Sequence, residues 1–269
     1  MNRRHVLCAI CSLPIGVLNS SALAETSDAI FGTLLGKYVL PNPDGVNRVD
    51  YARWKANGED MSRLNRYLTD QASQSPSKMP RDQAFVFWSN LYNAITLKVV
   101  LDRYPVASIR DIKSDSLLDP KAYIGPWRTK RVTIEGRSYS LDEIENDVLR
   151  PVFKDPRVHY TINCTAFGCP NLRTKAWSAA TLDADLGAAA RDFINHPRGV
   201  TVLPGNKLKV SSIYRWFGSD FGGNDVAIIA HLRKYAGAAL APALAAGAVI
   251  AEDDYDWSLN DVTAVSKSL

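Results

Sequence analysis

The residues with the clearest chemical potential lie together in the stretch HYTINCTAFGCPNLR, residues 159–173. This stretch holds one histidine and two cysteines, while the whole chain has only four of each. A thiolate is a strong nucleophile, and an imidazole is a common base for activating it. The same residue types also occur in zinc sites, in disulfide-closed turns and as plain structural residues. The sequence leaves these four interpretations open.

Residues 157–164, RVHYTINC, have the alternation of a β-strand. Because successive side chains of a strand point to opposite faces, His159 and Asn163 would share the polar face and Cys164 would point into the core. Cys169 follows a turn that can bring the chain back to the polar face. We therefore predict Cys169 as the nucleophile, His159 as its base and Asn163 as the residue that orients the imidazole, with the Cys169 sulfur closer to His159 than the Cys164 sulfur.

Two neighbouring features modify this prediction. Arg173 is close in sequence, and its positive charge would lower the pKa of a thiol at Cys169. A zinc site would need a third or fourth ligand, and strand alternation would point His159 away from Cys164. We therefore predict no metal and no cofactor, while a Cys164–Cys169 disulfide remains the main alternative to a free thiol.

A second polar cluster lies in DQAFVFWSNLYNAITLKVVLDRYP, residues 82–105, which has the composition of a long buried helix. Ser89, Asn90, Asn93 and Thr96 fall on one stripe of about 120°, at about 100° per residue. Buried amides need hydrogen-bond partners. We predict that Asn90 and Asn93 are buried and hydrogen-bonded, either to neighbouring backbone or as donors lining a pocket that faces His159.

Hairpins and helices alternate along the rest of the chain. RTKRVTIEGRSYS and VTVLPGNKLKVSS read as hairpins, and SLDEIENDVLR reads as a helix capped by Ser140, with Glu143, Glu145 and Asp147 on a solvated face. Trp216, Phe217 and Phe221, at helical spacing, read as core residues rather than as a ligand site. The absence of a βαβ rhythm indicates an α+β fold, in which the long buried helix packs on a small, mostly antiparallel sheet. A helix packed on a histidine-bearing strand suggests a papain- or transglutaminase-like architecture.

The N-terminus has the pattern of a cleaved export signal. Arg3 and Arg4 precede a short apolar run, and ALA ends at Ala24. Residues 1–24 are therefore predicted as a signal peptide, followed by a helical extension at 25–75, the main domain at 76–262 and a loose tail at 263–269. The predicted location is periplasmic or secreted, with no stable membrane span after cleavage.

Charge excludes some classes of partner. Removing the predicted signal lowers the net charge from +4 to +2, because that segment carries two arginines and no acidic residue. A nearly neutral chain without a Lys/Arg run gives no support for nucleic-acid binding. The expected partner is a small molecule or a peptide.

Several stretches together resemble one family. They are FWSNLYNAITL (87–97), YSLDEIENDVLR (139–150), DPRVHYTINCTAFGCPNLR (155–173), VSSIYRWFGSDF (210–221) and YDWSLND (255–261). This combination is similar to the domain of unknown function 547 (DUF547) of bacteria and plants, over roughly residues 76–261. The resemblance implies a fold and a location for the interesting residues, but no established reaction.

The functional hypothesis therefore comes from the residues. It is a thiol-dependent hydrolase or acyl transferase that uses Cys169 and His159, with Asn90 and Asn93 as pocket donors. The alternative is a non-enzymatic periplasmic binding or scaffold module with a structural Cys164–Cys169 disulfide.

The signal pattern makes one direct prediction. Protein recovered from the periplasm should begin at Glu25, because export would remove the residues through Ala24. N-terminal sequencing or intact mass of the recovered protein checks this. An intact Met1 on periplasmic protein would contradict it.

Overall fold

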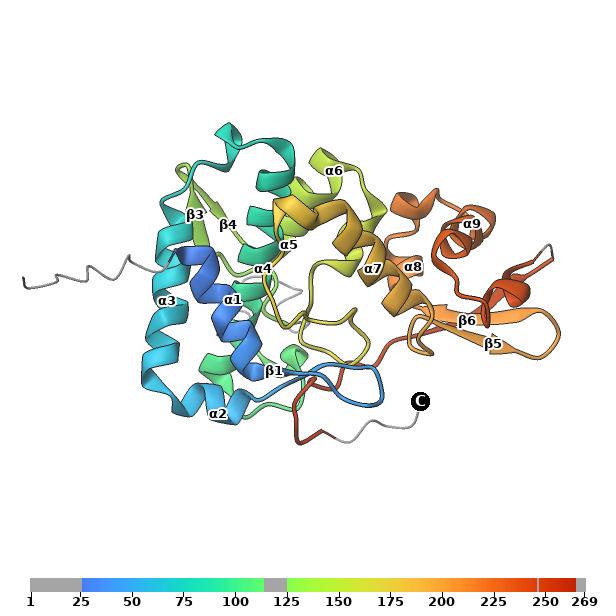
Figure 1. Cartoon of the computed structure of the whole chain (residues 1–269), viewed down its shortest axis with the longest axis horizontal. Coiled ribbons are helices and arrows are strands. Elements are labelled where there is room, and N and C mark those ends of the chain that lie inside the picture. The colour runs from blue at the N-terminus through green and yellow to red at the C-terminus, as the bar shows by residue number, and fades with distance from the viewer. Residues whose placement is uncertain (1–25, 114–124, 246, 265–269) are drawn as a thin grey trace, which may run out of the picture.

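The computed structural model describes residues 26–113, 125–245 and 247–264, and its larger hydrophobic core is built around one helix (Figure 1). This helix, α4 (Arg81–Arg103), is buried over most of its length. It ends before Pro105, which lacks the N–H that a helix would need and disfavours helical conformation at Tyr104. The predicted signal segment and residues 114–124 lie outside the described residues.

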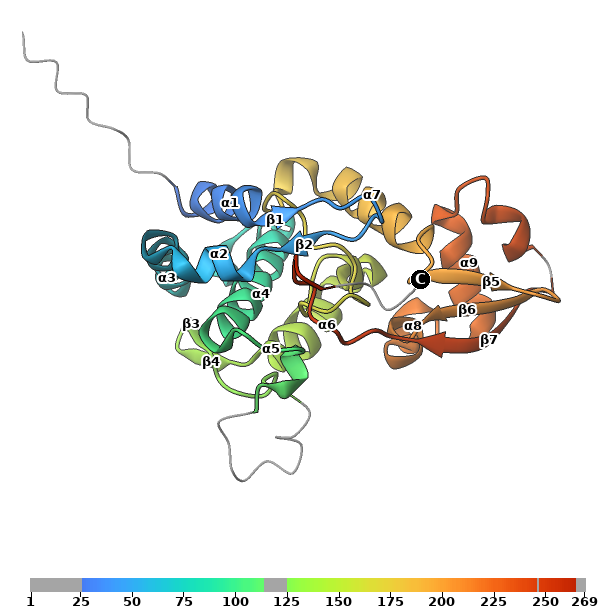
Figure 2. The same cartoon turned by 90° about the horizontal axis from the view of Figure 1, so that it is seen from below.

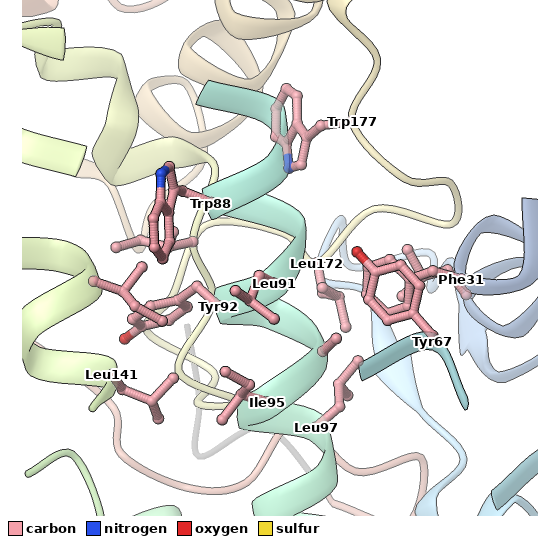
Figure 3. Close-up of a cluster of buried hydrophobic side chains, with 14 of the residues drawn as sticks. Phe31, Tyr67, Trp88, Leu91, Tyr92, Ile95, Leu97, Leu141, Leu172 and Trp177 are labelled. Carbon is pink, nitrogen blue, oxygen red and sulfur yellow. The ribbon is translucent and has the colours of Figure 1, made fainter. Parts of the chain in front are cut away.

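Helices surround α4 in this core. The main neighbours of α4 are α2 (Tyr51–Ala56), α3 (Gly58–Ala72), α5 (Leu141–Glu143), η1 (Pro76–Lys78), η4 (Ile144–Leu149) and η6 (Ala179–Thr181). The helix α1 (Ser27–Tyr38) packs on α3. Figure 3 shows Trp88, Tyr92 and Leu141 on one side of α4, and Leu172 and Tyr67 on the other. The helices that begin the described chain therefore share a hydrophobic core with α4.

Burial explains the apolar character of α4. It is the one described helix that is long and apolar enough to cross a membrane by length and composition, but 89% of its apolar window is buried inside the fold. Its hydrophobic side chains therefore pack in the core of the protein. The hairpin β3 (Val132–Ile134) and β4 (Arg137–Tyr139) also reaches it, because the Tyr139 ring packs 5.0 Å from that of Trp88.

A second hydrophobic core lies in the C-terminal part of the chain. Its sheet has the order β5 (Val200–Leu203), β6 (Lys207–Ser211), β7 (Val249–Asp254), and Figure 2 shows the three strands side by side. The β5–β6 pair is antiparallel and the β6–β7 pair is parallel. The helices α7 (Leu182–Ile194), α8 (Ile213–Trp216) and α9 (Asp225–Tyr235) accompany it.

The short elements complete the described chain. These are β1 (Val39–Leu40), β2 (Arg48–Val49), η2 (Ile109–Asp111), α6 (Arg150–Phe153), η5 (Pro156–Tyr160), η7 (Gly218–Phe221) and η8 (Ala241–Leu244). The mixture of helices with small, mostly antiparallel sheets confirms the predicted α+β class. Both predicted hairpins are present. The second turns at Gly205 and Asn206, whose φ angles of 75° and 59° suit glycine and asparagine.

The predicted strand at residues 157–164 is wrong. The chain forms the 3-10 helix η5 and then an irregular loop. Asp155 caps this helix by accepting a hydrogen bond from the Arg157 N–H, and Pro156 occupies its first turn, where a missing N–H costs nothing. Local capping chemistry therefore overrides the two-residue alternation, and the inference that placed His159 and Cys164 on opposite faces loses its basis.

The polar stripe of α4 is buried and hydrogen-bonded, as predicted. The Asn93 side chain donates to the Thr161 carbonyl over 2.8 Å and accepts from the Asn163 N–H over 2.8 Å. The Asn90 side chain binds the backbone N–H and carbonyl of Trp177 in the same two-sided way, at 3.0 Å each. The two amides bind backbone groups of an irregular loop, groups that would bind a neighbouring strand if the segment were part of a sheet. They therefore fix residues 161–177 against α4.

Replacing Asn93 by Leu should lower the free energy of unfolding by about 1–3 kcal/mol, because the Thr161 carbonyl and the Asn163 N–H would lose their buried partners. Chemical denaturation measures the change. Asn65→Leu is the matched control, since Asn65 is exposed on α3, and it should change the stability little. Equal effects of the two substitutions would contradict the assigned role of Asn93.

Candidate active site

The loop that follows His159 lies at the wall of a cavity of about 300 Å³. Its lining brings together His159, Cys164 and Cys169 with groups from distant parts of the chain. The remaining lining residues are Tyr92, Trp127, Asp142, Glu145, Asn146, Ile162, Pro170, Ile213, Trp216, Phe217, Tyr255 and Trp257. Aromatic rings make up much of this wall, and two carboxyl groups lie among them. An apolar cavity with a few converging polar groups is the usual form of a small-molecule site.

His159 is anchored by a carboxylate. Its Nε2 lies 2.8 Å from an Asp220 carboxylate oxygen, and its ring stacks on Phe217 with centroids 4.2 Å apart. Arg150 donates to both carboxylate oxygens of Asp220, from Nε over 2.6 Å and from Nη2 over 3.0 Å. An ionised carboxylate can only accept, so Nε2 is the protonated nitrogen of the neutral imidazole. The other nitrogen, Nδ1, is left free to accept a proton.

The ionisation of this pair follows from its surroundings. Burial by itself would raise the pKa of Asp220, but hydrogen bonds from His159 and Arg150 hold that pKa well below its usual range. Burial lowers the pKa of His159, although the Asp220 carboxylate opposes the shift. The pair therefore consists of a carboxylate and a neutral imidazole at neutral pH.

Glu145 faces the free side of the imidazole. Its carboxyl oxygen lies 3.9 Å from Nδ1 of His159, and its side chain is 13% exposed. Burial raises the pKa of Glu145 to about 7, with Arg150 opposing the shift and Asp142 and Asp220 adding to it. A carboxyl group with this pKa exchanges a proton easily at neutral pH.

The local fold puts Glu145 in this position. It lies in η4, a π-helical turn inserted between α5 and α6. Such turns are rare and often occur at functional sites. The expectation that Glu143, Glu145 and Asp147 form one solvated face is wrong for Glu145. Glu143 instead binds Lys130, and Asp147 binds Arg137. The widened turn explains why the three do not share one face.

The two cysteines are joined by a disulfide. Their connecting loop is held against the segment 256–260, because Phe167 N–H donates to the Ser258 carbonyl and Gly168 N–H to the Asp256 carbonyl. A side chain at Gly168 would come within 2.9 Å of the Tyr255 ring and the Asp256 nitrogen, so only glycine permits this approach. The Tyr255 hydroxyl lies 3.0 Å from the Cys164 sulfur and 2.9 Å from the Cys169 sulfur.

The other predicted site residues lie elsewhere. Asn163 binds the Pro170 carbonyl and the Thr165 N–H inside the loop, rather than the imidazole. Arg173 pairs with Asp185 over 2.9 Å and stacks on Trp177, so its charge is already matched. Asn90 and Asn93 bind backbone and are not among the residues lining the cavity. The structure thus brings together His159, Cys164 and Cys169, and places the remaining candidates in supporting positions.

Reasoning from the sequence missed the roles of Glu145 and Tyr255, which line the cavity, and of Arg150 and Asp220, which hold the His159 ring through the Asp220 carboxylate. Trp216 was assigned to the core, yet it is 50% exposed and lines the cavity. Each of these residues falls inside one of the stretches that carry the family resemblance. The family-like stretches were therefore a usable signal for these residues. The spacing of the stretches along the chain, however, did not reveal that they meet in space. No group of three or more His, Cys, Asp or Glu side chains in the described ranges could hold a metal ion.

Comparison with known families gives one match. Residues 76–194 match the family model described as "Protein of unknown function, DUF547". The match includes α4, Glu145, His159 and the disulfide loop, while Asp220 and Tyr255 come from the chain beyond it. Comparisons with curated proteins and with solved structures give no match.

The raised pKa of Glu145 predicts a pH-dependent stability. The folded protein keeps the Glu145 proton between pH 4.5 and about 7, where the unfolded chain releases it, so the wild type loses stability as the pH rises through that window. The Glu145→Gln substitution removes this loss of stability, because the glutamine side chain does not ionise. The variant should be more stable than the wild type by about 1–3 kcal/mol at pH 8 and indistinguishable from it at pH 4.

Denaturant titration at the two pH values measures this difference. Glu143→Gln is a control of opposite sign: burial opposes its ionisation, but hydrogen bonds from Lys130 and Ser140 lower the pKa of Glu143, so its charge stabilises the fold above pH 4.5. That substitution should reduce stability at pH 8. A Glu145→Gln variant that is less stable than the wild type at pH 8 would contradict the assigned burial.

Proposed function

Residues 76–194 belong to the DUF547 family, whose function is unknown, and we propose that they form, together with the C-terminal part of the chain, the active site of a hydrolase or acyl transferase that works by proton transfer. The observation that carries this proposal is the series Glu145–His159–Asp220, in which Glu145 and His159 line an aromatic cavity and Asp220 holds the imidazole. Perturbed ionisable groups that face one another in a cavity are typical of catalytic sites.

The proposed roles follow from the ionisation states. His159 accepts a proton at Nδ1 from the attacking nucleophile, and Asp220 stabilises the imidazolium that forms. Glu145 donates a proton to the leaving group and recovers one afterwards, which its pKa of about 7 permits. Arg150 is a positioning residue, because it contacts Asp220 rather than the cavity.

Two nucleophiles are consistent with this machinery. While the disulfide is closed, the Cys169 sulfur is bonded to Cys164, and water is the nucleophile that His159 would activate. In the thiol-dependent form of the proposal the disulfide is first reduced and Cys169 attacks. That form is supported by the position of Cys169 on the same cavity wall as His159.

The walls favour a substrate with an apolar or aromatic group. Trp127, Trp216 and Trp257 line the cavity, and the ring centroids of Trp216 and Trp257 lie 5.6 Å apart. Such rings bury apolar surface and stack on flat groups.

We also propose that the protein acts in an exported location, where a disulfide persists.

The second candidate is a binding module without turnover. It is supported by the closed disulfide, which removes the thiol nucleophile and fixes the loop. In that case the cavity would hold a small molecule or a peptide side chain, and the carboxyl groups would serve recognition alone.

The test uses p-nitrophenyl acetate, butyrate and benzoate as probes. The wild type should hydrolyse at least one of them faster than buffer, and both Glu145→Gln and His159→Gln should lower kcat/KM about 100-fold, the usual cost of losing a general acid or base. Glu143→Gln should leave kcat/KM unchanged, because Glu143 lies outside the cavity lining.

Reductant separates the two mechanisms. Activity that persists without reductant and in Cys169→Ser indicates water as the nucleophile. Activity that requires reductant and disappears in Cys169→Ser indicates the thiol. Absence of hydrolysis, together with quenching of tryptophan fluorescence by p-nitrophenol, would replace the enzymatic proposal by the binding module.

A further inference from the structure

The two sulfurs of the disulfide have different surroundings. Both cysteines line the cavity, but Cys169 is only 3% exposed, whereas Cys164 is partly exposed. A thiolate that enters the cavity therefore reaches the Cys164 sulfur more easily. Attack on Cys164 would make Cys169 the leaving group.

The surroundings of the Cys169 sulfur would also stabilise a negative charge on it. This sulfur accepts the backbone N–H of Cys164 over 3.0 Å, and this contact distinguishes it from the Cys164 sulfur, because the Tyr255 hydroxyl lies 2.9 Å from Cys169 and 3.0 Å from Cys164. Disulfide sulfurs have no hydrogen to donate, so the tyrosine hydroxyl must be the donor. Two donors aimed at a developing thiolate lower its pKa, and a thiol of lower pKa leaves faster in exchange.

The loop is held by more than the disulfide. Hydrogen bonds join its backbone to Asp256 and Ser258, and the Asn163 side chain ties its beginning to Pro170. These contacts do not involve sulfur. Breaking the S–S bond therefore leaves the loop anchored on both sides, which a reversible redox site requires and a purely structural disulfide does not.

We propose that Cys164–Cys169 is a thiol–disulfide exchange centre for an external dithiol that enters through the aromatic cavity. The dithiol thiolate attacks the Cys164 sulfur, the S–S bond breaks, and Cys169 leaves as a thiolate that accepts hydrogen bonds from the Cys164 N–H and Tyr255. The second thiolate of the dithiol then attacks its own sulfur in the mixed disulfide and releases Cys164. The protein gains two electrons and two protons overall, and the dithiol becomes a disulfide.

The first experiment needs no substitution. The oxidised full-length protein is treated with glutathione in native buffer, quenched with acid and mapped by peptide mass. Glutathione should be found on Cys164. A predominant adduct on Cys169 would overturn the proposed direction of attack.

Dithiothreitol is the second probe. It should release two thiols while far-ultraviolet circular dichroism and cooperative thermal unfolding persist. Thiols that appear only in denaturant would mean a structural disulfide and would overturn the proposal. Neither experiment depends on ester hydrolysis, so failure of the exchange proposal would leave the water-dependent hydrolase standing, and failure of the hydrolase would leave the exchange proposal standing.

Substitutions test the leaving-group stabilisation. Tyr255→Phe removes one donor to the Cys169 sulfur and should slow reduction by dithiothreitol roughly fivefold. Tyr214→Phe is the matched control, because it removes a buried hydroxyl that binds Tyr160 rather than sulfur, and its rate should equal that of the wild type. Equal rates for Tyr255→Phe and the wild type would contradict the assigned role of Tyr255.

Single-cysteine variants test the asymmetry of access. Cys169→Ser, which keeps the partly exposed thiol, should react with 2,2′-dithiodipyridine at least about tenfold faster than Cys164→Ser, which keeps the buried one. The reverse order would overturn attack at Cys164. Variants that fail to fold do not affect the glutathione and dithiothreitol results on the unmodified protein.

Discussion

The site depends on four hydrogen bonds from two asparagine side chains of α4. Asn93 and Asn90 bind backbone groups at Thr161, Asn163 and Trp177, near the beginning and at the end of the loop that carries both cysteines. This loop has almost no regular secondary structure, so its buried backbone groups would otherwise lack partners at a high cost. The amides thus let an irregular segment lie against α4, which is buried over most of its length.

Once the loop is fixed, the chemistry follows from which elements meet it. The turn η4 contributes Glu145, the short helix η7 contributes Asp220, and β7 leads into Tyr255. Burial among aromatic rings raises the pKa of Glu145 to about 7, while Arg150 helps keep Asp220 ionised. The cavity therefore holds two proton-exchanging groups beside a disulfide, and the proposed hydrolysis by water and the proposed exchange use different atoms of its lining.

The sequence predicted the elements better than the site. Strong local signals identified the long buried helix, the hairpins at Gly136 and Gly205 and the buried asparagine stripe, because each depends on neighbouring residues. The strand at 157–164 failed since alternation is a weaker signal than the Asp155 cap and Pro156. Glu145 was assigned to a solvated face and Asp220 was not singled out, because their roles arise from contacts with His159, a residue distant along the chain, and periodicity does not report such contacts. Asn90 and Asn93 were correctly expected to be buried, but they position the loop instead of lining the cavity.

The central claim is that burial beside His159 prepares Glu145 for proton transfer, and its direct test is a carbon-13 NMR titration of the Glu145 carboxyl in the intact protein. The account predicts a midpoint near pH 7, which Glu145 owes to burial, together with a neutral His159 ring that is protonated at Nε2. A midpoint near 4.5, the ordinary value for glutamate, would mean that water reaches the carboxyl freely. That result would contradict the proposed acid–base site.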